Sequence, residues 1–203
     1  MARIKNGILG PYVGTIGPVV GSSRNGVPYL KSRPKRRRRK RDSGEKLNQD
    51  KFSVVHYWLQ PLIDYLREGF KGSSSGAYNA AKSYALKHAV KEDSGKWNID
   101  PSQIKTSQGN LALPEDIKVT RDENNVLQFT WGKSPSDGSR YDQVMIVAYN
   151  GNKVVGKERG QFRSNLADTL DLGKTSSTKY HIYISFIADD RSRQSESVYL
   201  GQL

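Results

Sequence analysis

Nine residues near the N-terminus, Arg33 to Arg41, constrain this chain more than any other stretch of its sequence. Eight of the nine are Lys or Arg, and the ninth, Pro34, restricts the residue before it to extended conformations. Cations this close together repel one another, so the run cannot join a core and stays solvated unless a polyanion neutralises it. Three interpretations are open at this point: a plain solvated segment, a contact with nucleic acid, or a contact with an anionic membrane surface.

The charge of the chain is distributed unevenly about this run. The formal net charge of the 203 residues is +13. Residues 1–51 carry fourteen Lys/Arg and three acids, whereas residues 52–203 carry nineteen Lys/Arg and seventeen acids. Such an asymmetry between segments points to a polyanionic partner better than a high isoelectric point does. We therefore expect nucleic acid as a partner, bound without sequence preference.

The chain contains no cysteine, which excludes disulfides, thiol nucleophiles and Cys-based metal sites. Glycines and prolines interrupt every apolar stretch of its first 23 residues. A signal peptide needs roughly 7–15 continuous apolar residues, and a membrane helix needs about 20. We expect neither a signal peptide nor a membrane span, and a cytoplasmic or virion-associated location.

The leader before the run is predicted to be extended and to contain a β-hairpin. Val19–Ser23 and Val27–Leu30 flank Asn25 and Gly26, a pair that is preferred where both turn residues need a positive φ. The many glycines of the leader allow another backbone to approach closely, which suits an arm that pairs with a neighbouring subunit. An unstructured leader is the alternative. The residues expected to contact a partner protein are Tyr12, Val19, Val20, Tyr29 and Leu30.

Two amphipathic helices are expected after the run. The first begins at Asn48, whose side chain can cap a helix, and continues to about Phe70 with apolar residues three and four positions apart. Pro61 lies inside this helix and is expected to kink or divide it. A turn at 72–76 leads to a second helix over 77–90, which has a face of small residues. Because small faces permit close packing, the pair is predicted to form a helical hairpin.

The apolar period changes from that of a helix to that of a strand after residue 110. Residues 91–110 are polar and are predicted to be irregular, with Trp97 and Ile99 as apolar anchors. Seven short alternating segments follow within about 90 residues, which predicts a β-sandwich. These segments are 117–119, 126–131, 143–149, 153–155, 168–172, 180–186 and 197–200.

This strand pattern resembles a fibronectin type III domain, because Trp131 ends the second segment and aromatic and apolar residues alternate over 180–186. The resemblance implies that the Trp lies in the core and that a Tyr, either Tyr180 or Tyr183, forms a corner hydrogen bond. The predicted fold class is α+β: an extended N-terminal arm with a β-hairpin, a helical hairpin, and a C-terminal seven-stranded fibronectin type III/Ig-like β-sandwich. The predicted boundaries are 1–47 for the arm and basic run, 48–110 for the helical hairpin and linker, and 111–203 for the sandwich.

Nearly the whole sequence also resembles an uncharacterised protein family. It is similar to a domain-of-unknown-function family that is common in Bacteroidota genomes and their mobile elements. The resemblance implies a leader, helices and β-strands in this order, and it implies no catalytic residues. Relatives usually have a milder Pro/Asn/Thr-rich linker in place of residues 36–41, so the polyanion hypothesis depends on this chain's own residues. The stretches that carry the resemblance are Ile4–Gly10, Val19–Ser23, Gln49–Phe52, Ala77–Ala81 and Val198–Gly201.

No residue pattern in the chain predicts an enzyme. Residues 72–76 match Gly-x-Ser-x-Gly, but a nucleophile elbow needs a strand before its serine, and here a helix precedes it. His56, His88 and His181 each lie alone in their elements, without a second ligand at metal-binding spacing. We therefore expect no catalytic residues, no metal and no cofactor.

These observations predict a non-enzymatic structural or adaptor protein. Its arm assembles into a homo- or hetero-oligomer, and its Arg-rich run contacts nucleic-acid phosphates without reading bases. A phage or mobile-element particle component fits this prediction. The alternative is a cell-envelope or surface binding module whose basic run contacts anionic lipid or glycan. The residues expected to bind nucleic acid are Arg33, Lys35, Arg36, Arg37, Arg38, Arg39, Lys40 and Arg41.

Overall fold

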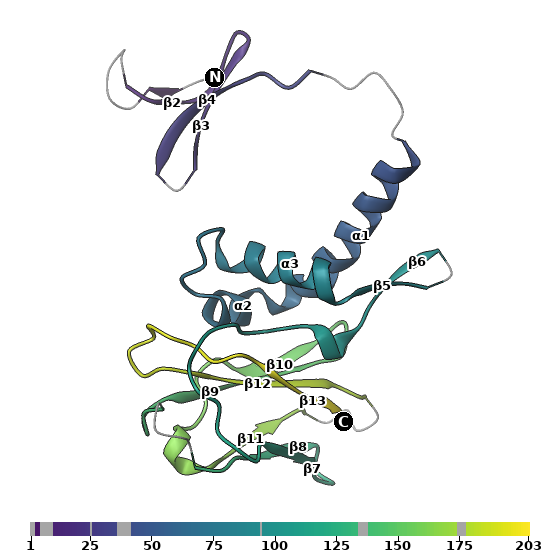
Figure 1. Cartoon of the computed structure of the whole chain (residues 1–203), viewed down its shortest axis with the longest axis vertical. Helices are drawn as coiled ribbons and strands as arrows, with labels where there is room; N and C mark the ends of the chain where they lie inside the picture. The colour runs from purple at the N-terminus through teal and green to yellow at the C-terminus, as the bar shows by residue number, and fades with distance from the viewer. Residues whose placement is uncertain are drawn as a thin grey trace. The chain divides into compact units, whose positions relative to one another are not determined.

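The computed structural model describes residues 3–4, 10–24, 26–35, 42–93, 95–133, 138–173 and 178–203. The chain forms two compact units, Met1–Asp42 and Ser43–Leu203, which are called the N-terminal unit and the C-terminal unit below. Figure 1 traces both units. The fold class is α+β, as predicted: a pair of helical segments accompanies antiparallel sheets.

The described part of the N-terminal unit is a four-stranded antiparallel sheet in the order β1-β2-β3-β4. The predicted hairpin is confirmed as β3 (Val19–Arg24) and β4 (Val27–Ser32). The leader is not an extended arm with a single hairpin, however, because β1 (Arg3–Ile4) and β2 (Tyr12–Ile16) add to it. The additional turn is possible because Gly17 adopts a φ of 56° between β2 and β3, which costs glycine little. The first residue of the predicted Asn-Gly turn, Asn25, lies outside the described residues.

The helical segment begins earlier than predicted. Helix α1 spans Ser43–Leu59, so Asn48 lies inside it and is not its cap. Glu45 lies in the first turn, where a negative charge favours the positive end of the helix dipole. Pro61 divides the helix as predicted: the short 3₁₀ helix η1 (Gln60–Leu62) separates α1 from α2 (Ile63–Gly69). After a turn, α3 (Ala77–His88) completes the predicted helical pair.

Residues 90–99 are a hairpin, so the prediction of irregular chain was wrong there. Strand β5 (Val90–Asp93) pairs antiparallel with β6 (Lys96–Ile99), and the 3₁₀ helix η2 (Pro101–Gln103) follows. Sequence patterning misses this hairpin because it has few apolar residues. It is anchored through tertiary contacts instead: the Trp97 ring lies 5.3 Å from Lys51 Nζ of α1, and Ile99 packs against the helical core.

Between residues 118 and 202, apart from the undescribed stretches 134–137 and 174–177, seven strands form two antiparallel sheets. One sheet has the order β11-β8-β7 and the other the order β10-β9-β12-β13. Each strand lies within a few residues of a predicted segment, because alternating burial imposes the period of two that the sequence shows. Their bounds are β7 Lys118–Arg121, β8 Val126–Thr130, β9 Gln143–Tyr149, β10 Val154–Lys157, β11 Ala167–Asp171, β12 His181–Ile187 and β13 Val198–Gln202.

The larger sheet of the C-terminal unit is covered on both faces (Figure 1). On one face, Ile146 and Ile184 pack against residues of the smaller sheet, such as Phe129. On the other face, Val147 and Tyr183 pack against the helices. This position explains why β9 and β12 read as almost continuous apolar runs, since strands buried on both faces have no solvent side. No helix among the described residues combines the length and the apolar character needed to cross a bilayer.

Candidate interaction surfaces of the N-terminal unit

In the sequence, the predicted basic residues come at the end of the N-terminal unit. Arg33 and Lys35 follow β4 and are exposed, and the Arg33 backbone N–H donates to the Pro18 carbonyl over 2.7 Å, which extends the β3–β4 pairing. The remaining predicted residues of the run, Arg36 to Arg41, lie outside the described residues. The N-terminal unit, residues 1–42, contains twelve Lys/Arg and one acid, a formal charge of +11, whereas residues 43–203 carry +2.

Strand register assigns the side chains of the N-terminal sheet to two different faces. Gly14 pairs with Gly21, and Gly21 pairs with Leu30. Because alternate residues of a strand point to the same face, these pairs define one face without a charged residue. We call it the uncharged face. Its members on β2, β3 and β4 are Tyr12, Gly14, Ile16, Val19, Gly21, Ser23, Pro28, Leu30 and Ser32.

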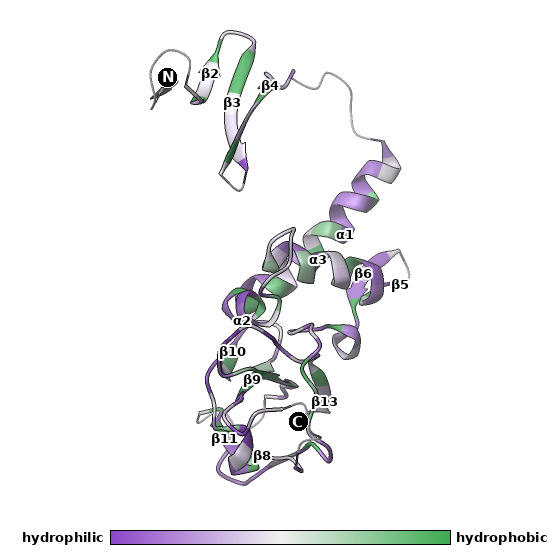
Figure 2. Cartoon of the chain, turned by 60° about the vertical axis from the view of Figure 1, so that its left-hand side comes forward, coloured by the Kyte–Doolittle hydropathy of each residue, from purple (hydrophilic) through white to green (hydrophobic). Residues whose placement is uncertain are grey.

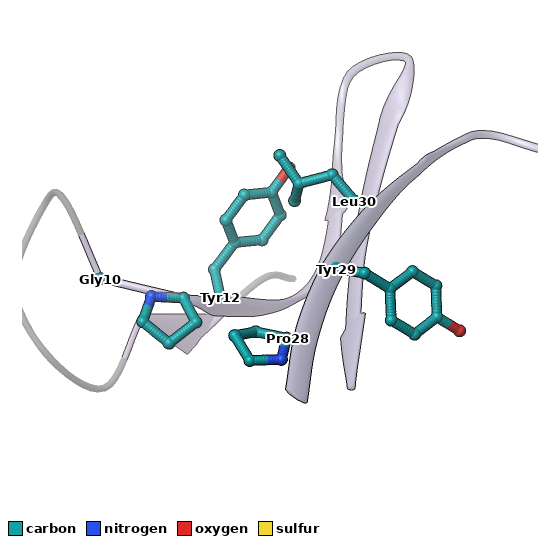
Figure 3. A pocket seen from close by; sticks show the side chains of 6 residues that line it. Gly10, Tyr12, Pro28, Tyr29 and Leu30 are labelled. Carbon is teal, nitrogen blue, oxygen red and sulfur yellow. The ribbon is translucent and has the colours of Figure 1, made fainter. Parts of the chain in front are cut away.

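The uncharged face contains a shallow cavity of about 370 Å³, which Figure 3 shows from close by. Tyr12, Pro28 and Leu30 line it together with Gly10, Pro11 and Tyr29. The Tyr12 ring lies directly over Gly21: a Cβ atom on Gly21 would come within 2.7 Å of the ring atom Cδ2. Glycine is therefore required at this position, because a Cβ atom would also collide with the Tyr12 backbone oxygen. Leu30 remains 64% exposed beside the ring, so this face is an apolar surface open to a partner.

The opposite face carries the charged residues of β3 and β4, and we call it the cationic face. Ser22 pairs with Tyr29, Val20 pairs with Lys31, and Arg24 pairs with Val27. In Figure 3 the Tyr29 side chain points away from Tyr12 and Leu30. Lys31 Nζ lies 6.0 Å from the centre of the Tyr29 ring, at the outer limit of a cation–π contact.

The five predicted protein-contact residues therefore do not form one surface. Tyr12, Val19 and Leu30 lie on the uncharged face, whereas Val20 and Tyr29 lie on the cationic face. Sequence analysis did not separate them, although the signal was present in β3 and β4: in each of these strands the charged residue falls in only one of the two alternating sets of positions. Figure 2 shows the hydrophobic residues of β2 and β3, which a unit of this size does not bury in a core of its own.

One group of titratable side chains lies between α1 and α3. Lys82 Nζ lies 3.2 Å from His56 Nδ1 and over the rings of Phe52 and Tyr78, at 4.6 and 4.5 Å. Burial lowers the pKa of the Lys82 ammonium, and the two rings partly replace the water that it loses. The Tyr78 hydroxyl also lies 3.1 Å from His56 Nδ1. This cluster joins the two helices.

The other two histidines lie apart from this cluster. His181 Nδ1 is 2.9 Å from the Tyr199 hydroxyl, and burial lowers the pKa of His181. His88 packs against the Tyr84 ring at 4.5 Å. Within the described ranges, no three residues of the kind that ligate metals come together in a group that could hold an ion.

A family model matches residues 11–201, which include the strands from β2 onward and all the helices. The chain belongs to the family of unknown function DUF6266. The predicted membership of an uncharacterised family is thereby confirmed. No curated protein and no solved structure matched the chain. The arrangement of a DUF6266 chain therefore has to be interpreted from its own residues.

Proposed function

We propose that this DUF6266 protein is a non-enzymatic structural or adaptor protein that contacts nucleic acid through its Arg-rich run. The single observation that carries the proposal is the charge of the two units, +11 for residues 1–42 and +2 for residues 43–203. A compact unit with one acid among twelve cations has almost no internal counter-ions, so a polyanion is the partner that lowers its electrostatic energy. Phosphate contacts of this kind position a protein without reading sequence.

In this proposal, the uncharged face of the N-terminal sheet mediates assembly with other subunits. Leu30, Tyr12 and Ile16 offer an apolar surface, and the face carries no charge that would repel a second protein. A component of a phage or mobile-element particle, located in the cytoplasm or in the virion, combines both properties: it associates with other subunits and neutralises packaged nucleic acid.

In this proposal, the two sheets of the C-terminal unit are the two halves of a fibronectin type III-like sandwich. Their orders, β11-β8-β7 and β10-β9-β12-β13, divide seven strands three to four between facing sheets. Trp131 is buried, as the resemblance implies, and its ring meets that of Phe186 edge to face at 5.4 Å. The Tyr183 hydroxyl donates to the Pro101 carbonyl over 2.7 Å, which ties the sheet to the segment that precedes it. Such a domain would offer a further protein-contact surface.

The salt dependence of DNA binding tests the nucleic-acid contact. If all eight cations of the run bind phosphates, the slope of log affinity against log salt for duplex DNA is about −7. Replacing Arg36, Arg37, Arg38 and Arg39 with Ser makes the slope shallower by about 3.6. The matched control replaces four exposed lysines of the C-terminal unit with Ser, and it leaves the slope near its original value. These lysines are Lys46, Lys71, Lys87 and Lys153.

The same variants separate this proposal from a cell-envelope module. An envelope module binds vesicles of anionic lipid, or an anionic glycan, more tightly than DNA at matched salt. An unchanged DNA slope in the four-arginine variant would show that the run makes no phosphate contact.

Light scattering tests the assembly: the full chain forms oligomers, and deletion of residues 2–32 gives a folded monomer. A full chain that is monomeric at every concentration would contradict assembly through this sheet.

A further inference from the structure

The cationic face places one aromatic side chain between two cations. On β3 and β4, the pairs Arg24–Val27, Ser22–Tyr29 and Val20–Lys31 follow one another along the hairpin. Successive pairs on one face are two residues apart, or about 6.6 Å. Tyr29 therefore stands in the middle of this face, with Arg24 on one side of it and Lys31 on the other.

Packing within the N-terminal unit does not account for the position of Tyr29. Its side chain is 42% exposed and points away from Tyr12 and Leu30, as Figure 3 shows. Its cross-strand partner on β3, Ser22, is small and cannot cover the ring. The flat ring is therefore presented to solvent, where a planar ligand can lie on it.

A flat exposed ring between cations matches the chemistry of single-stranded nucleic acid. An unpaired base stacks on an aromatic ring, while the phosphates on either side of it bind the neighbouring Lys and Arg. Duplex DNA does not offer this contact, because its bases are already stacked on one another and only their edges are open in the grooves. Stacking accepts every base, so the site adds affinity without sequence preference.

We propose that the cationic face is a stacking site for single-stranded nucleic acid, in which Tyr29 receives a base and Arg24 and Lys31 bind the flanking phosphates. The inference rests on the proposed phosphate contact of the Arg-rich run and adds to it a contact that only single strands can make. The site is continuous with that run: Arg33, whose backbone N–H extends the β3–β4 pairing, and Lys35 follow Lys31 along the chain. A strand that leaves the Tyr29 ring past Lys31 meets these cations next.

The test measures the affinity of the full chain for three probes at one salt concentration: a single-stranded oligonucleotide, a duplex of the same length, and heparin. Tyr29→Ala weakens binding of the single strand by about 5- to 150-fold, the loss expected for one stacked base. It leaves the affinity for duplex and for heparin within about twofold, since neither presents an unstacked base. Tyr29→Phe retains the aromatic ring and the affinity. Tyr57→Ala, which removes an exposed tyrosine of α1, is the matched control and changes none of the three affinities.

Salt titrations separate stacking from charge. Tyr29→Ala leaves the slope of log affinity against log salt for the single strand unchanged, because tyrosine neutralises no phosphate. Arg24→Gln and Lys31→Gln each make that slope shallower by about 0.7. Equal losses for all three probes in Tyr29→Ala, or a loss also in Tyr29→Phe, would overturn the stacking site and leave the phosphate contact standing. A wild-type chain that binds none of the probes would overturn the proposed function itself.

Discussion

Helix α2 contacts the segment that follows the β5–β6 hairpin. Because of this contact, Gly→Ala at the end of α2 is expected to destabilise the protein, whereas the same substitution inside a helix usually stabilises it. Gly→Ala inside a helix usually stabilises a protein by about 1 kcal/mol. Gly69 ends α2, and a Cβ atom there would lie 2.1 Å from the Thr106 carbonyl oxygen and 2.8 Å from the Ser107 Cα. Both neighbours are backbone atoms, so they cannot rotate away as a side chain would. We expect Gly69→Ala to destabilise the C-terminal unit.

The magnitude follows from the contacts that hold this segment. The Gly69 carbonyl accepts hydrogen bonds from the Gln108 backbone N–H at 2.9 Å and the Ser107 hydroxyl at 3.1 Å. Overpacking costs about 1–3 kcal/mol, and loss of these two bonds costs about 1 kcal/mol each. After subtraction of the gain in helix propensity, the free energy of unfolding falls by about 2–4 kcal/mol. For a unit of this size that lowers Tm by about 4–16 °C.

Denaturant unfolding followed by tryptophan fluorescence is the suitable assay, because Trp58, Trp97 and Trp131 all lie in the C-terminal unit. Gly44→Ala in α1 is the matched control, since a Cβ atom there meets nothing within 4 Å. The control is expected to be neutral or to raise the free energy of unfolding by up to about 1 kcal/mol. If Gly69→Ala proves as stable as Gly44→Ala, the close approach described above is not present in solution.

Two further predictions concern buried and hydrogen-bonded acids. Asp142→Ala removes the carboxylate whose Oδ2 lies 2.9 Å from the buried Arg163 guanidinium, and it lowers the free energy of unfolding by about 3–5 kcal/mol. The double variant with Arg163→Met recovers most of this loss in the same denaturation assay, and a double variant as unstable as the single one contradicts the charge explanation. Hydrogen bonds from Lys91 and Ser102 lower the pKa of Asp100 to about 2, from an ordinary value of 3.8. Since the folded state binds this proton more weakly than the unfolded state, the stabilisation is full above about pH 4 and disappears as the pH falls through about 2. Asp100→Asn therefore flattens the loss of Tm between pH 4 and pH 2, and a parallel pH profile in the variant would refute the assignment.

The sequence predicts the elements of the C-terminal unit well because their apolar residues keep a regular period. The strand over 143–149 is predicted to the residue, and Pro61 divides the first helix for the steric reason that its ring dictates. The β5–β6 hairpin is missed because its stability comes from Trp97 against α1, a tertiary contact that leaves no period in the sequence. The start of α1 is missed because its first turns are exposed and polar.

The candidate site is predictable in its residue types and not in its geometry. Charge counting finds the basic segment, and the tyrosines near it are visible as candidates for contact. Which of them share a face depends on the registers of β2 with β3 and of β3 with β4, and Gly14 weakens the strand signal of β2 in the sequence. Tyr12 and Tyr29 look equivalent in the sequence because both lie in the leader that precedes the basic run. In the folded sheet one ring covers Gly21 and the other faces away from it.

The position of β9 and β12 between two apolar layers has a practical consequence for dissecting this family. A fragment that begins after the helices would expose Val147, Tyr149 and Tyr183 to water, and a fragment that ends before β7 would expose the apolar stripe of α1 and α3. Either piece would expose an apolar surface that is buried in the intact chain. Pull-down or display experiments with such fragments would then report nonspecific binding to this newly exposed surface. The piece from Ser43 to Leu203 is the smallest one that keeps both faces of the larger sheet covered.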